Sequence, residues 1–95
     1  MKDAMEFIRD IGVRLESLRQ TIELIETRLH ELEHVNEQTY RRLDTIRQRS
    51  ESIRRVVQDL KEASVERVER LRNDITIDVL EIEKAISKLK YDLNM

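Results

Sequence analysis

The sequence predicts an all-α protein built on one long coiled-coil helix, and three observations support this prediction. From Ala4 to Leu60, apolar residues recur at alternating spacings of four and three without a change of phase. Of the 95 residues, 40% are charged and only 3% are aromatic, and one glycine and no proline are present to interrupt a helix. Because such a helix needs a cover for its apolar seam, we expect a homo-oligomer, either a dimer or a tetramer.

The heptad segment, residues 4–60, is expected to begin at Asp3. Asp3 is a suitable N-cap, and Glu6 three residues later completes a weak capping box. The apolar residues of the a and d positions are predicted to form the oligomer core. They are Ile8, Ile11, Leu15, Leu18, Ile22, Ile25, Leu29, Leu32, Leu43, Ile46, Ile53, Val57 and Leu60.

Two polar residues, Asn36 and Thr39, occupy adjacent core positions of this pattern. A polar side chain in a coiled-coil seam costs stability but fixes the alignment of the helices, so we predict that these two residues set the register. A hairpin turn over residues 34–39 is the competing interpretation. We reject it because the heptad phase is unchanged and because Arg41 and Arg42 would stand at the positive end of a second helix.

After Leu60 the apolar spacing changes. Residues 61–75 follow an eleven-residue repeat, which straightens a left-handed supercoil. Residues 73–76 are weak helix formers, so a break or bend is expected there, followed by a short C-terminal helical segment over residues 76–93. We therefore expect residues 1–95 to form a single coiled-coil unit with these three segments. Apolar residues of the last segment lack a cover in this arrangement, which predicts a fold-back onto the rod or a protein partner there.

The residues that flank the seam favour antiparallel helices. In a parallel dimer, several arginines, such as Arg42 and Arg47, would face each other across the seam. The apolar stripe is also wider than a two-stranded seam, which favours a tetramer or an additional partner. The residues that widen it are Met5, Phe7, Val35, Tyr40, Val56 and Ala63.

Positive charge is concentrated in the middle of the chain. Residues 1–40 carry five basic and nine acidic groups, residues 41–55 carry six basic and two acidic groups, and residues 56–95 carry seven basic and nine acidic groups. This distribution favours pairing between acidic and basic helices. The alternative is a helical module that binds nucleic acid or another acidic partner, although Tyr40 is the only nearby aromatic residue for base stacking. The candidate contacts are Arg41, Arg42, Arg47, Arg49, Arg54 and Arg55.

One motif resembles a catalytic site in form. Residues 30–34 match the H-E-x-x-H pattern in which two histidines bind zinc and the glutamate acts as a base. In the heptad register His30 and His34 face solvent, and a catalytic zinc also needs a third ligand in a closed cleft. We therefore expect no metal, no cofactor and no enzymatic activity.

The remaining features limit the functional classes. The chain has no cysteine, and no apolar run long enough to span a bilayer or to act as a signal peptide. A cytoplasmic location is the default expectation. The function predicted from the sequence is therefore that of a structural or interaction protein, a self-associating coiled-coil scaffold or tether.

Overall fold

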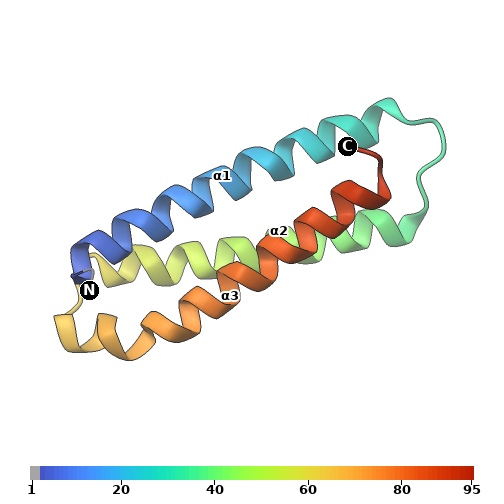
Figure 1. Cartoon of the computed structure of the whole chain (residues 1–95). Helices are drawn as coiled ribbons and strands as arrows, with labels where there is room; N and C mark the ends of the chain where they lie inside the picture. The colour runs from blue at the N-terminus through green and yellow to red at the C-terminus, as the bar shows by residue number, and fades with distance from the viewer. Residues whose placement is uncertain (1–2) are drawn as a thin grey trace.

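The computed structural model describes residues 3–95, which form three α-helices. They are α1 (Ala4–Glu31), α2 (Glu37–Leu60) and α3 (Val65–Asp92). The helices run up, down and up again, so that α2 is antiparallel to both of its neighbours (Figure 1). Each helix packs against the other two, and the bundle measures 49 × 20 × 17 Å. The all-α prediction is confirmed, whereas the prediction of a single long helix is wrong.

The first correction concerns residues 32–36, where the sequence predicted a continuous helix. α1 ends at Glu31, and α2 begins after Asn36. Glu37 lies in the first turn of α2, whereas Arg41 and Arg42 lie beyond it, so the start of α2 carries the charge that the helix dipole favours. The last turn of α1 carries both Arg28 and Glu31, so its charge does not oppose a turn here.

The second correction concerns the C-terminal third of the chain. The turn lies at residues 61–64, not at 73–76, and residues 73–76 lie inside α3. The eleven-residue repeat predicted for residues 61–75 therefore spans a loop and the first turns of a new helix. The residues assigned to a short helix over 76–93 belong mostly to α3, which does fold back on α1 and α2 (Figure 1).

All three helices begin with the same kind of cap. The Asp3 side chain accepts a hydrogen bond from the backbone N–H of Glu6 at 2.8 Å, which confirms the predicted cap. Asn36 accepts from the N–H of Thr39 at 3.0 Å, and Ser64 accepts from the N–H three residues later at 3.3 Å. Each cap satisfies one of the backbone donors that a helix start leaves without an intrahelical partner.

The core is a continuous apolar column between the three helices. Each helix contributes one stripe of side chains to it. Its buried apolar members are Ala4, Phe7, Ile11, Leu15, Leu18, Ile22, Ile25, Leu29, Leu43, Ile46, Val57, Leu60, Val68, Ile75, Val79, Ile82, Ile86 and Leu89. The residues that widen the apolar stripe are only partly covered: Phe7 is buried, Val35 and Ala63 are half-buried against the core, and Met5, Tyr40 and Val56 are exposed. The guanidinium of Arg72 in α3 lies 5.0 Å from the ring centroid of Phe7.

Candidate interaction surface

The residues predicted to form an oligomer core face the interior of one chain. Ten of the thirteen are buried, and Ile8, Leu32 and Ile53 are half-buried against the same core. Asn36 is exposed at the start of α2, where it caps the helix, and Thr39 is half-buried in the first turn. The apolar seam therefore needs no second chain to cover it.

The arginine-rich segment of α2 is directed largely toward the other two helices. Arg42 pairs with Asp92 at 3.0 Å, and Arg49 pairs with Glu81 of α3 at 2.9 Å. On the opposite edge, Arg47 forms an ion pair with Glu26 of α1.

The three remaining arginines of the segment are placed differently. The pKa of Glu16 in α1 is lowered mainly by its hydrogen bond to Arg19, and the positive charge of Arg54 lowers it further. Arg41 pairs with Glu37 within the first turns of α2, and Arg55 is exposed. The acidic–basic–acidic charge pattern is thus used within one chain, between α2 and its two neighbours.

A further ion pair joins α1 to α3 across the bundle. Arg14 uses two nitrogens to contact both carboxylate oxygens of Glu83, and its Nε lies 3.1 Å from Oε2. The hydrogen bond to Glu83 raises the pKa of the Arg14 guanidinium. Both side chains keep about a third of their surface in solvent, at 34% and 33%. Glu83 can therefore still accept a bond from another cation.

The H-E-x-x-H pattern does not have the helical geometry that its chemistry requires. His30 lies in the last turn of α1, whereas His34 lies in the loop that follows, and both are exposed. The two imidazoles are therefore not held one turn apart on a helix. Over residues 3–95, no group of three or more His, Asp or Glu side chains is arranged to hold a metal ion. In the same residues, no helix is apolar enough over a sufficient length to cross a membrane.

Apart from Val65 at its first position, which is 65% exposed, α3 exposes three apolar residues on its outer side, away from the core. Ile77 is 53% exposed, Leu80 is 43% exposed and Tyr91 is 81% exposed. Together with exposed Lys84 and Ser87, they follow spacings of three, four, three and four, which places them on one helix face. We call these five residues the outer α3 face.

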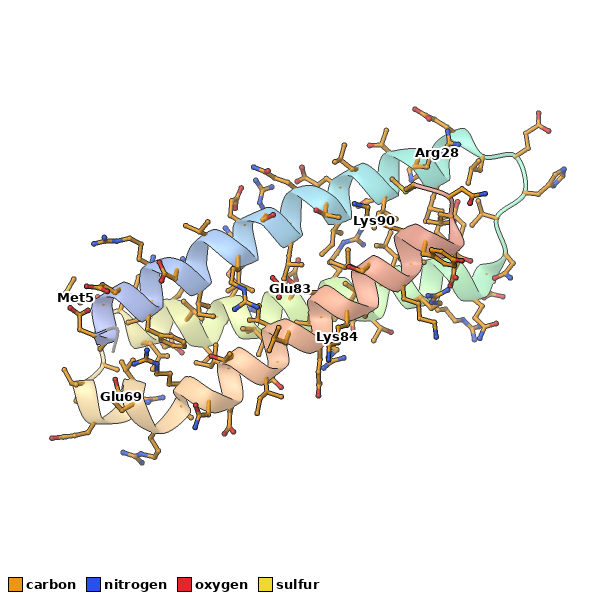
Figure 2. All side chains as sticks on the ribbon, in the orientation of Figure 1. Met5, Arg28, Glu69, Glu83, Lys84 and Lys90 are labelled. Carbon is orange, nitrogen blue, oxygen red and sulfur yellow. The ribbon has the colours of Figure 1, made fainter. Side chains whose placement is uncertain are left out.

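Both edges of the outer α3 face carry charges of both signs. Glu81 and Lys88 form the edge toward α2, since Glu81 pairs with Arg49 and Lys88 lines a groove between the two helices. Glu83 and Lys90 form the edge toward α1, and Lys84 points away from α1 (Figure 2). Neither Lys88 nor Lys90 forms an ion pair within the part of the chain that the structure describes.

α1 also exposes apolar side chains, but they are more dispersed. Val13 is 65% exposed and Leu24 is 64% exposed, three turns apart on the outer side. Near the N-terminal end of α1, Met5 and Ile8 line an open groove that α1 shares with Val57 of α2. Val13 and Leu24 provide a comparison surface for the outer α3 face, since they are similarly exposed and are joined by exposed Ser17 and Gln20 at heptad spacing, but have no third apolar residue in their stripe.

The outer α3 face could be predicted only in part from the sequence. Apolar residues without a cover were expected in the C-terminal segment, but Ile77 and Leu80 were not separated from their buried neighbours, and Tyr91 was not included. The missing signal was a second heptad stripe, displaced by two residues from the core stripe of Val79 and Ile82. Two interleaved stripes on one helix indicate a second packing face.

The comparisons with known proteins add no relative. No protein family matches the sequence, and no curated protein or solved structure is significantly similar to it. The surface described above is therefore the basis for the functional proposal.

Proposed function

We propose that the protein is a non-catalytic interaction module that self-associates through the outer α3 face, and so acts as a short scaffold or tether. The observation that supports this proposal is the heptad-spaced outer stripe of α3, in which Ile77, Leu80 and Tyr91 remain exposed after the core is complete. A helix with a second apolar stripe packs favourably against another helix. The partner expected for the C-terminal segment is then a second copy of the chain.

The shape of the molecule is consistent with such a role. The bundle is 49 Å long and 20 × 17 Å in cross-section, and its three helices are tied together by ion pairs between every pair of neighbours. A stiff bundle of this kind holds whatever is attached to its ends at a defined separation.

Binding of nucleic acid through the arginine-rich segment has less support. Arg42, Arg47 and Arg49 pair with acidic side chains of α1 and α3, so much of their charge is already balanced. Without a surplus of positive charge, a protein gains little from contacts with phosphates.

Sedimentation equilibrium tests the proposed self-association. The wild-type chain should show a mass that rises toward the dimer as its concentration approaches about 1 mM, because a single helix face gives a weak contact. The double variant Leu80→Ser with Tyr91→Ser should stay monomeric. The matched control, Val13→Ser with Leu24→Ser, removes equally exposed apolar surface from α1 and should associate like the wild type. A wild-type chain that stays monomeric throughout would contradict the proposal.

A further inference from the structure

We infer that two copies of the chain pack α3 against α3 in an antiparallel arrangement, with a two-fold axis level with the bond between Ala85 and Ile86. This inference rests on the proposed self-association and specifies its geometry. Most soluble homodimers have two-fold symmetry, so that the same patch of both copies forms the contact. The outer α3 face suits this symmetry because its apolar members lie near both ends and its polar members lie at the centre.

In this arrangement, side chains of the outer α3 face meet side chains of the same face in the other copy. Leu80 of each copy lies opposite Tyr91 of the other, so these two exposed apolar side chains gain a cover, whereas Ile77 lies level with Asn94 of the other copy, beyond the end of its α3. At the centre, Lys84 of each copy lies opposite Ser87 and not opposite a second lysine. In a parallel arrangement, by contrast, the two Lys84 ammonium groups would face each other across the seam.

The charges on the edges select this register among the antiparallel ones. With the axis level with residues 85 and 86, Glu81 lies beside Lys88 of the other copy, and Glu83 lies beside Lys90 of the other copy. Symmetry doubles these contacts, which gives four attractive pairs. Among residues 3–95 the lysines have no ion-pair partner, and the glutamates, whose side chains are 56% and 33% exposed, can each accept a second donor besides their internal arginine.

The neighbouring registers place like charges together. Moving the axis by half a heptad toward the N-terminus of α3 sets Glu81 against Glu81 and Glu83 against Glu83, and the attraction that it gains between Asp74 and Lys88 is confined to the edge toward α2. Moving it equally far toward the C-terminus sets Lys88 against Lys88 and Lys90 against Lys90. Like charges at flanking positions disfavour a register, so only one of the three is attractive at both edges.

The contact area between the two α3 helices is small, so the affinity of the dimer is low. Stable protein interfaces bury about 800 Å² on each partner, and a contact of four side-chain layers between two helices buries less. The dimer is therefore weak and sensitive to salt, because a large part of its specificity comes from exposed ion pairs.

A charge-swap experiment tests the geometry. Variant one carries Lys88→Glu and Lys90→Glu, and variant two carries Glu81→Lys and Glu83→Lys. In either homodimer all four pairs become repulsive, so association should weaken at least about tenfold. An equimolar mixture restores all four attractive pairs and should form heterodimers with the wild-type affinity. The control Arg55→Glu with Lys61→Glu, in α2 and at its C-cap, makes the same change in net charge as variant one and should associate like the wild type.

Disulfide trapping provides a second test that leaves the internal ion pairs intact. The chain has no cysteine, so no background crosslink forms. A mixture of Leu80→Cys and Tyr91→Cys chains should crosslink, whereas each variant alone should not, because identical positions are about 16 Å apart along the helix axis. Wild-type association without any effect of the charge swap, or strong crosslinking of Leu80→Cys alone, would overturn this geometry and leave the proposed self-association standing. Failure of the wild type to associate at all would remove both.

Discussion

Two leucines of α3 permit a matched test of the bundle. Leu89 is 0% exposed in the core, whereas Leu80 is 43% exposed on the outer α3 face. Replacing a fully buried leucine with alanine costs about 2–5 kcal/mol, because apolar contacts are lost and a cavity remains. A domain of this size has only about 5–15 kcal/mol of stability, and each kcal/mol shifts its Tm by about 4–8 °C. Leu89→Ala should therefore lower Tm by at least about 8 °C, and Leu80→Ala should cost about 1 kcal/mol or less.

Thermal unfolding and urea denaturation, both followed by circular dichroism, measure the Tm and the free energy of unfolding of both variants. The experiment should be carried out at low micromolar concentration, where the weak dimer is dissociated. The midpoints should not depend on protein concentration, since the core is completed within one chain. Equal losses for the two variants, or midpoints that rise with concentration, would refute the placement of the core.

Three further predictions follow from individual residues. Asn36→Leu should lower stability by about 1 kcal/mol in urea denaturation, because it removes the cap of α2; an increase in stability would favour Asn36 as a buried seam residue instead. Gly12→Ala should raise stability by about 0.5–1 kcal/mol, since a Cβ at this mid-helix position meets no atom within 4 Å; a lower Tm would show that the site is more crowded than in this structure. A double-mutant cycle of Arg14→Gln and Glu83→Gln should give a coupling energy of up to about 1 kcal/mol that falls as salt is added; zero coupling at low salt would mean that the pair does not form in solution.

The inward-facing residues of the first two helices could be read from the sequence because the apolar period reports directly which side of a helix is buried. Ile25 and Leu29, both assigned to a seam, are fully buried in the bundle. The period does not report which chain supplies the cover. A stripe that packs against two helices of its own chain and a stripe that packs against another molecule have the same spacing.

The turn at residues 32–36 was missed for a related physical reason. The five loop residues separate the stripes of α1 and α2 by a whole number of heptads, so the phase appears to continue from Leu29 to Leu43. Asn36 fits both interpretations, since asparagine is favoured as an N-cap and is also tolerated in a coiled-coil seam. The distinguishing signal was the repetition of caps at Asp3, Asn36 and Ser64, each followed within three residues by a glutamate.

The outer α3 face was harder to recognise because it shares a helix with the core. Between Ile75 and Ile82, apolar residues of both stripes alternate closely, and no spacing rule separates them until the position of the other two helices is known. The two charged edges of this face can be recognised only from the structure, in which Glu81 faces α2 and Glu83 faces α1.

Small-angle X-ray scattering in dilute solution tests most directly whether the heptad seam is closed within one chain. The bundle has a radius of gyration of 15.1 Å over its Cα atoms, so the extrapolated value should lie close to this, with a small increase from side chains and hydration. A continuous helix of this length would be a rod about 140 Å long with a radius of gyration of about 40 Å. A value near that of the bundle is predicted, and a value near that of the rod would contradict the folded-back chain and the outer α3 face together.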